Sequence, residues 1–310
     1  MESFRAKCVF SSEWDKFAKE CYSENFGEEP HGDITQIPEE EVPQHDVLCA
    51  GFPCQAFSIS GNRRGFEDTR GTLFFDVVRI AKYHQPKVLL LENVKNFEKH
   101  DDGKTLATVL NALKDIGYVS FHKVINSSVF GVPQRRERIY IVALLKGRTD
   151  TPFQFPQGVD LKTNVHSILE KEVSSEHYLQ RDDIDIYKDP NIPPDLFGNF
   201  PQRPLQIGKV NKGGQGERIY SEFGHAVTQA ATTGGPGGST GLYFVDGKVR
   251  KLSPKESSRL QGFPEEFQPH PRRAQALKQI GNSVVINVLQ GIIKQLIDLG
   301  FLESRSDGEL

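Results

Sequence analysis

The chain has 310 residues, 37% of them hydrophobic, and a net charge of −3, values that are ordinary for a globular protein with one or two domains. No run approaches the roughly 20 apolar residues of a membrane span, and the N-terminus lacks a signal-peptide core, so we expect a cytoplasmic protein. The small net charge excludes attraction of a polyanion by the overall charge of the protein, so any polyanion site must be a local basic patch. Cys8, Cys21, Cys49 and Cys54 form no pair of C-x-x-C units, so we expect free thiols and no metal site.

The first half of the chain alternates apolar runs with segments of helical spacing. Strands are expected at residues 6–11, 46–50, 88–91, 118–125 and 138–145. Helices are expected at residues 16–25, with Asp15 as a cap, and at residues 71–83 and 105–116. This alternation predicts an α/β fold with a mostly parallel sheet covered on both faces.

The composition changes after residue 146. Prolines interrupt residues 147–247 and helical periodicity is weak, which indicates a second, smaller, loop-rich domain. From residue 248 the chain becomes regular again and ends in a helix at about residues 284–299. Val288, Ile292, Leu296 and Leu299 have helical spacing there, so residues 248–310 are expected to return to the first domain.

One cysteine follows a strand-like run at a point where the backbone must turn. Gly51 and Pro53 end the run 46–50 and place Cys54 on a loop. Open α/β sheets carry ligands and catalytic groups at this end of their strands. A free cysteine is more often a packing residue, so the segment alone leaves a buried structural thiol open.

A carboxyl group and two guanidinium groups are expected at the same edge. Glu92 directly follows the apolar run 88–91, and burial there would raise the pKa of its carboxyl group, which suits a proton donor; a capping or ion-paired Glu is the alternative. Arg136 and Arg138 point to one side of an extended segment, where they could hold an anion or activate a thiol. A solvated charge cluster is the other interpretation.

Together these groups fit methyl transfer to a pyrimidine, in which a thiolate adds to C6, a carboxyl group contacts N3, and C5 becomes nucleophilic. The blocks GFPCQAFS, ENV and QRRER, in this order, resemble the signatures of cytosine-5 DNA methyltransferases. Further matching blocks extend the resemblance over about residues 2–298. Within the family the chain most resembles the HhaI-type restriction–modification methyltransferases, notably at residues 49–60 and 212–220.

The resemblance implies a role for each matched position. Cys54 is the nucleophile, Glu92 contacts N3, Arg138 holds the flipped cytosine and Arg136 supports this loop. S-adenosylmethionine is expected to contact Glu13, Trp14, Asp33, Ile34, Pro53, Leu73, Asn282, Ser283 and Val284. The partner is double-stranded DNA, from which the target base must be flipped out. DNA contacts are expected at Ser58, Ser60, Arg63, Arg70, Lys212, Gln215, Arg218 and Thr228, with Ser60 and Gln215 filling the gap in the base stack.

One block of the family has no counterpart here. Members normally begin with a strand and a Gly-rich turn of the type F-x-G-x-G, so we expect a Rossmann-like sheet without that central strand, between the strands at Cys8 and Val47. Three hypotheses follow: a monomeric methyltransferase that an added N-terminal segment completes, a catalytically silent DNA-binding module, and, third, an RNA-methylating relative. The resemblance suggests GCGC as the recognised sequence, although Thr232 replaces an aromatic residue in the recognition loop.

Overall fold

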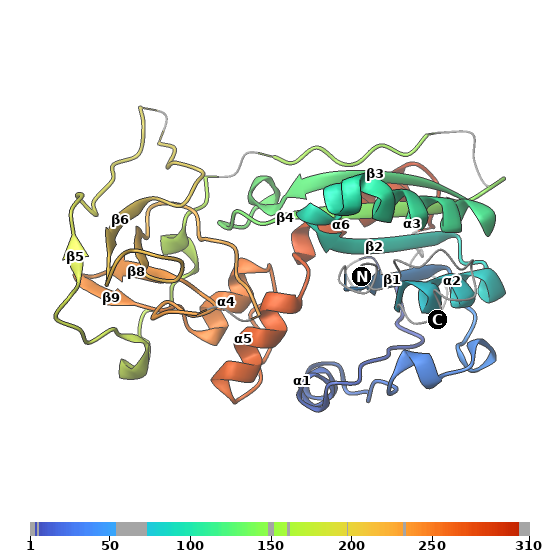
Figure 1. Cartoon of the computed structure of the whole chain (residues 1–310), viewed down its shortest axis with the longest axis horizontal. Helices are drawn as coiled ribbons and strands as arrows, with labels where there is room; N and C mark the ends of the chain where they lie inside the picture. The colour runs from blue at the N-terminus through green and yellow to red at the C-terminus, as the bar shows by residue number, and fades with distance from the viewer. Residues whose placement is uncertain are drawn as a thin grey trace.

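The computed structural model describes residues 4, 6–53, 73–147, 152–159, 162–196, 198–231 and 234–303. Figure 1 shows two lobes, one built around the sheet that contains β1 to β4 and the other around the sheet that contains β5 to β9. Helix α5 (Arg273–Asn282) lies between them. We refer to the two lobes by the roles that the resemblance implies, as the catalytic lobe and the recognition lobe.

The sheet of the catalytic lobe has the strand order β1-β2-β4-β3. Its strands are β1 (Val47–Gly51), β2 (Val88–Val94), β3 (Tyr118–Asn126) and β4 (Glu137–Leu145). Only β1 and β2 run parallel, whereas β4 is antiparallel to both β2 and β3. The prediction of a mostly parallel sheet was therefore wrong for these strands. The short connection between β3 and β4 leaves no room for the crossover helix that parallel neighbours require.

Helices cover both faces of this sheet, as predicted. Helices α2 (Leu73–His84) and α3 (Lys104–Asp115) pack on the face that carries Leu89 and Leu91. Helix α6 (Ile286–Asp298) packs on the opposite face, which carries Val88 and Leu90. Successive residues of β2 point to opposite faces, so a strand buried on both sides is apolar throughout.

The C-terminal helix docks on the catalytic lobe through the predicted residues. Val288, Ile292 and Leu296 are buried against the sheet, whereas Leu299 follows the helix and is partly buried. The region Arg273–Asp298 is long and apolar enough to cross a membrane by composition. It is divided into α5 and α6 by a break at residues 283–285, and the apolar face of α6 is buried in the protein, which identifies a core helix.

The predicted strand at residues 6–11 does not join a ladder of the described residues. Ser12 forms one isolated bridge with His31, and residues 6–10 have no regular secondary structure. A strand needs a partner for its backbone groups, and β1 pairs only with β2 among the described residues. The next helix is as expected, since Asp15 accepts hydrogen bonds from Phe17 and Ala18 at the start of α1 (Lys16–Phe26).

The recognition lobe contains a five-stranded sheet of order β5-β6-β7-β8-β9. Its strands are β5 (Asp185–Ile186), β6 (Gln206–Lys209), β7 (Arg218–Ser221), β8 (Leu242–Val245) and β9 (Lys248–Arg250). The sheet thus extends three residues past position 247. Short 3-10 segments lie at Ile34–Gln36, Glu39–Glu41, Lys95–Gly103, Ser127–Phe130, Val165–Ile168 and Ser175–His177.

A buried ion pair fixes helix α4 (Pro254–Leu260) to this sheet. Both nitrogens Nη1 and Nη2 of Arg250 donate to the carboxylate of Glu256, at 2.8 and 2.7 Å. Glu256 also accepts from the backbone N–H of Ser253, whose hydroxyl caps the helix. Because the carboxylate accepts several hydrogen bonds, the two charges are compensated although the residues Arg250 and Glu256 are only 2% and 0% exposed.

We predict that Arg250→Met lowers the free energy of unfolding by about 3–5 kcal/mol, because it leaves the Glu256 carboxylate buried without its charged partner. Urea denaturation measures the change. The matched control is Lys294→Met, which removes the exposed pair with Asp298 and should cost less than about 1 kcal/mol. Equal effects of the two changes would contradict this assignment.

Candidate functional site

The carboxyl ends of β1 and β2 lie side by side at one edge of the catalytic lobe. Gly51 is the register partner of Glu92, and a side chain at Gly51 would place its Cβ 3.9 Å from the Glu92 carboxylate. The side chain of Asn93 donates a 2.7 Å hydrogen bond to the backbone oxygen of Phe52. The Phe52 ring is buried beside Phe74, with 5.2 Å between ring centroids. The chain that enters the Cys54 loop is therefore anchored directly beside Glu92.

Several predicted site residues belong to the loop that follows. Cys54, Ser58, Ser60, Arg63 and Arg70 lie outside the described residues. Pro53, the last described residue before the loop, is exposed. Leu73, the first residue after it, is 38% exposed and begins α2.

Glu92 meets Arg138 across the sheet. The guanidinium Nε of Arg138 lies 3.1 Å from Oε1 of Glu92, and both side chains are about 15% exposed. The Nε–H bond of Arg138 does not point at Oε1 of Glu92, so this oxygen is buried without an aligned hydrogen bond. Burial raises the pKa of the Glu92 carboxyl group, and the charges of Arg138 and Arg136 oppose that rise. The pair presents a carboxyl group that can still bind one more polar partner.

Arg136 has a different environment from Arg138. It is 2% exposed, and its guanidinium donates to the backbone oxygens of Gln229, Gly281 and Ser283 at 2.8–3.0 Å. Burial lowers its pKa to about 10, with the charge of Arg138 acting in the same direction. These bonds hold together the segments around the site, which supports the expected supporting role of Arg136.

Two turns of the predicted cofactor site lie together below the sheet. The backbone N–H of Glu13 donates to His31 at 3.0 Å, next to the Ser12–His31 bridge. The Trp14 ring is 80% exposed. Asp33 accepts from the backbone N–H of Thr35 and thereby shapes the turn that contains Ile34.

Two further contacts tie these turns to the rest of the site. Arg79 of α2 donates to the backbone oxygen of Ile34 at 2.6 Å. Lys278 of α5 donates to Asp15 at 2.7 Å, which brings the end of α5 toward Trp14. Asn282, Ser283 and Val284 follow at that end, and Asn282 is exposed.

This arrangement fits a nucleoside cofactor. An exposed aromatic ring can stack on adenine, and nearby carboxylates can accept hydrogen bonds from ribose hydroxyls or an amino group. Glu13, Trp14 and Asp33 supply these groups from two adjacent turns. The residues present therefore fit the adenosine part of S-adenosylmethionine.

The predicted DNA-contact residues of the recognition lobe lie on exposed loops, except Arg218, which begins β7. Lys212, Gln215, Arg218 and Thr228 are all exposed. Glu217 accepts hydrogen bonds from the side chain of Asn211 and the backbone N–H of Gly214, and these bonds fix the shape of the loop at residues 211–217. This loop also contacts the Gly-rich loop at residues 234–241 closely.

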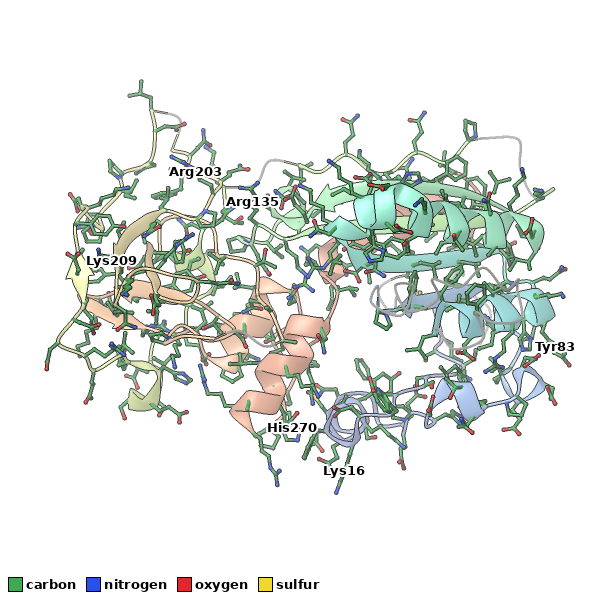
Figure 2. The ribbon with its side chains drawn as sticks, in the orientation of Figure 1. Lys16, Tyr83, Arg135, Arg203, Lys209 and His270 are labelled. Atoms are coloured by element: carbon green, nitrogen blue, oxygen red, sulfur yellow. The ribbon has the colours of Figure 1, made fainter. Side chains whose placement is uncertain are left out.

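Glycine is required where these two loops meet. Gly216 has φ +78°, and a Cβ there would lie 2.2 Å from the backbone oxygen of Gly234. The two loops therefore form one packed surface rather than separate linkers. Arg135 is also exposed where the two lobes meet (Figure 2). Thr228 donates to the backbone oxygen of Arg135 at 2.6 Å, a link that sequence reasoning missed.

Comparison with known proteins agrees with this geometry. The family model described as "C-5 cytosine-specific DNA methylase" matches residues 1–298. The chain is 50% identical over 293 residues to the type II methyltransferase M.HhaI of Haemophilus parahaemolyticus, covering 94% of this chain and 88% of that protein. It is 41% identical to M.HpaII of Haemophilus parainfluenzae, covering 96% and 85%.

Solved structures share the fold at low sequence identity. A Spodoptera frugiperda DNMT2 mutant superposes with a TM-score of 0.70 at 18% identity, covering 96% of this chain and 94% of that one. Dnmt2 of S. pombe gives 0.69 at 19% identity, covering 94% and 91%. These values establish the same α/β architecture, including the second lobe.

We predict that Glu92→Gln stabilises the protein increasingly as the pH rises above about 4.5, the ordinary carboxyl pKa. Because the folded-state pKa is raised, stability associated with the protonated carboxyl is lost as the pH rises through that pKa, and Gln stays neutral. Thermal unfolding between pH 4.5 and pH 8 measures the difference. Exposed Glu266→Gln is the control and should follow the wild-type curve; parallel curves for Glu92→Gln and wild type would refute the prediction.

Proposed function

Since the chain belongs to the family of C-5 cytosine-specific DNA methylases, which use S-adenosylmethionine, we propose that it is the methyltransferase of a bacterial type II restriction–modification system. It acts on double-stranded DNA in the cytoplasm, as a monomer. The observation that carries the proposal is the Glu92–Arg138 pair beside Gly51, at the start of the loop that contains Cys54.

The proposed reaction uses three side chains of this edge. The Cys54 thiolate adds to C6 of the cytosine. Glu92, with its raised pKa and an Oε1 that lacks an aligned hydrogen bond, hydrogen-bonds or protonates N3, so that negative charge does not build up on the ring. Arg138 contacts the oxygen at position 2 and orients the carboxyl group. C5 then becomes nucleophilic and takes a methyl group, which S-adenosylmethionine would supply when bound, leaving as S-adenosylhomocysteine. Loss of the C5 proton to a base and departure of the Cys54 thiolate from C6 restore the ring and the free enzyme.

The recognition lobe supplies the proposed DNA contacts. Lys212 lies on the packed Gly-rich loops, and Arg218 lies beside them at the start of β7; the positive charges of both side chains suit phosphates or base edges. Gln215 of the same loops would fill the space that the flipped base leaves in the stack. Ser58, Ser60, Arg63 and Arg70 of the 54–72 loop approach the same DNA from the catalytic lobe in this proposal. The cofactor contacts are those of Glu13, Trp14, Asp33, Ile34, Pro53, Leu73, Asn282, Ser283 and Val284.

An added extended segment is proposed to complete the sheet. Within the described residues, β1 pairs with β2 along one edge only, so the backbone groups of its other edge are available. Cys49, in the middle of β1, is exposed as a free thiol. Strand addition to such an edge pairs the backbone groups and fills alternate side-chain positions.

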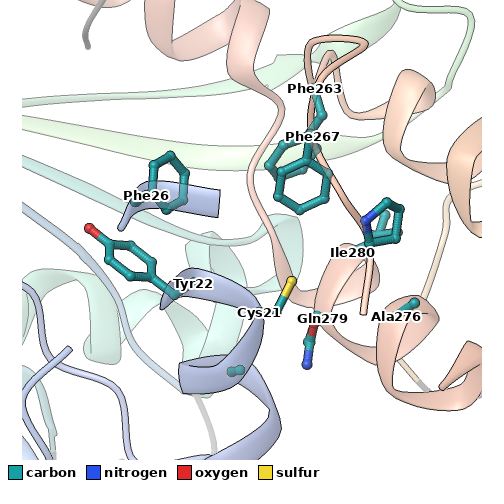
Figure 3. A pocket seen from close by; sticks show the side chains of 10 residues that line it. Cys21, Tyr22, Phe26, Phe263, Phe267, Ala276, Gln279 and Ile280 are labelled. Carbon is teal, nitrogen blue, oxygen red and sulfur yellow. The ribbon is translucent and has the colours of Figure 1, made fainter. Parts of the chain in front are cut away.

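Helix α1 is only partly covered by the described residues, through contacts such as that of Phe17 with His270. None of its eleven residues is buried, whereas α2, α3 and α6 each bury at least four. Its Cys21, Tyr22 and Phe26 line an apolar cavity of about 170 Å³ together with Phe263 and Ile280 (Figure 3). In this proposal, apolar side chains of the added segment fill this cavity between α1 and α5.

We predict that the chain transfers label from methyl-labelled S-adenosylmethionine to duplex DNA, and that Cys54→Ser abolishes transfer while DNA binding persists. Glu92→Gln should lower the rate by about 10²–10⁴-fold, because N3 loses its proton donor. Bisulfite sequencing of a randomised duplex pool would identify the methylated sequence and test the GCGC suggestion. Normal transfer by Cys54→Ser would reject the mechanism.

The complementing segment has a separate test. A peptide that carries the strand and F-x-G-x-G turn with which members of the family normally begin should raise the midpoint of thermal unfolding and increase transfer. Hydrogen exchange should slow at Cys49 and Gly51 of β1, because Val88 donates to Asp46, so the alternate residues 46, 48 and 50 face β2 and the N–H groups of Cys49 and Gly51 face the edge that becomes paired. A peptide of the same composition in scrambled order is the control, and equal effects of both peptides would reject strand addition.

A silent DNA-binding module is the second candidate, favoured by the open edge of β1. In that case DNA binding, with the steep salt dependence of phosphate contacts, would occur without transfer, with or without the peptide. An RNA-methylating relative would instead transfer label to RNA and not to duplex DNA.

A further inference from the structure

A buried group of polar side chains joins the two lobes. Gln134, Arg136, Gln229 and Gln261 are each at most 2% exposed, and we call them the glutamine junction. Gln134 and Arg136 precede β4 of the catalytic lobe, Gln229 lies in the recognition lobe, and Gln261 follows α4. The site chemistry proposed above leaves the three glutamines without a role.

Shared hydrogen bonds place these residues in one cluster. The Gln134 side chain accepts from the backbone N–H of Gln229 at 3.0 Å and donates to the backbone of Leu260 at 3.0 Å. Arg136 donates to the backbone oxygen of Gln229 at 2.9 Å. The Gln261 side chain donates to Ile280 of α5 at 3.1 Å. The junction therefore connects the recognition lobe to the ends of α4 and α5.

Four polar atoms of the junction have no hydrogen-bond partner. Two are donors, Nε of Arg136 and Nε2 of Gln229. Two are acceptors, Oε1 of Gln229 and Oε1 of Gln261. An unpaired polar atom costs free energy when buried, so each calls for an explanation. The donors and acceptors match in number, and the two atoms of the Gln229 amide could satisfy the other two.

The backbone beside Gln229 lies in direct contact with α5. A Cβ at Gly281 would lie 2.5 Å from backbone atoms of Ala230 and Ala231, a separation that no side chain tolerates. Gly281 therefore lets the backbone of residues 229–231 pack directly on α5. With this backbone held in place, rotation of the Gln229 side chain changes the position of its amide relative to Arg136 and Gln261, which belong to other elements.

We propose that Gln229 is a positioning residue with a second hydrogen-bonding arrangement, adopted when DNA holds the recognition lobe. In that arrangement its amide oxygen accepts from Nε of Arg136 and its amide nitrogen donates to Oε1 of Gln261. The inference rests on the proposed DNA substrate. Arg136 is two residues from Arg138, so the arrangement of the junction sets how Arg138 meets Glu92.

The test substitutes Gln229 by leucine, which has a similar volume and no polar atoms. Because Gln229→Leu removes an unpaired amide from the DNA-free protein, its midpoint of thermal unfolding should rise by about 2–4 °C. The duplex for the binding measurement is first selected from a randomised pool by its binding to the wild-type protein. The Kd of Gln229→Leu for this duplex should be higher than that of the wild type, on the order of tenfold. A structural defect would instead lower the midpoint and weaken binding together.

Gln134→Leu is the matched control, because the Gln134 amide is bonded at both ends and its removal should lower the unfolding midpoint. A lower midpoint for Gln229→Leu, or wild-type affinity for the selected duplex, would overturn the inference. If the wild-type protein enriches no duplex from the pool, the proposed function and the DNA-dependent arrangement are both overturned. If the wild-type protein and Gln229→Leu bind the selected duplex equally well, only the inference about Gln229 is rejected.

Discussion

The ion pair between Glu92 and Arg138 is the contact on which the candidate site depends. Each side chain is held at the edge of a buried sheet, where the low dielectric strengthens their attraction and penalises an unpaired charge. The sheet positions both residues, since Glu92 lies on β2 and Arg138 on β4, and Arg136, two residues before Arg138, bonds to backbone groups at the junction of the lobes. The site therefore requires the catalytic lobe and the lobe junction to be correctly folded at the same time.

Much of the catalytic lobe could be predicted from local patterns. The apolar run at residues 88–91 predicted a strand buried on both faces, and the spacing of Val288, Ile292 and Leu296 predicted the docking helix. Asp15 predicted the start of α1 because its side chain caps backbone N–H groups directly. In each case the signal lies within a few residues of the structure that it specifies.

Long-range pairing was harder to predict. The strand expected at residues 6–11 has suitable residues, but no described neighbour pairs with it. The site convergence of Glu92 and Arg138 was predicted, whereas the links made by Asn93, Gln134 and Gln229 were not. Amide side chains give little sequence signal, because whether one is bonded, unpaired or exposed depends on segments distant in the chain.

The reversed direction of β4 has a consequence for how the lobes can diverge. Because β4 runs against β2, its first residues rather than its last lie beside the end of β2, which brings Arg138 to the edge that holds Glu92. The chain then leaves that edge along β4 and enters the recognition lobe from the far side of the sheet. Insertions after Leu145 can thus lengthen or replace the second lobe while Glu92 and Arg138 keep their register, so the second lobe can change without altering the charged pair.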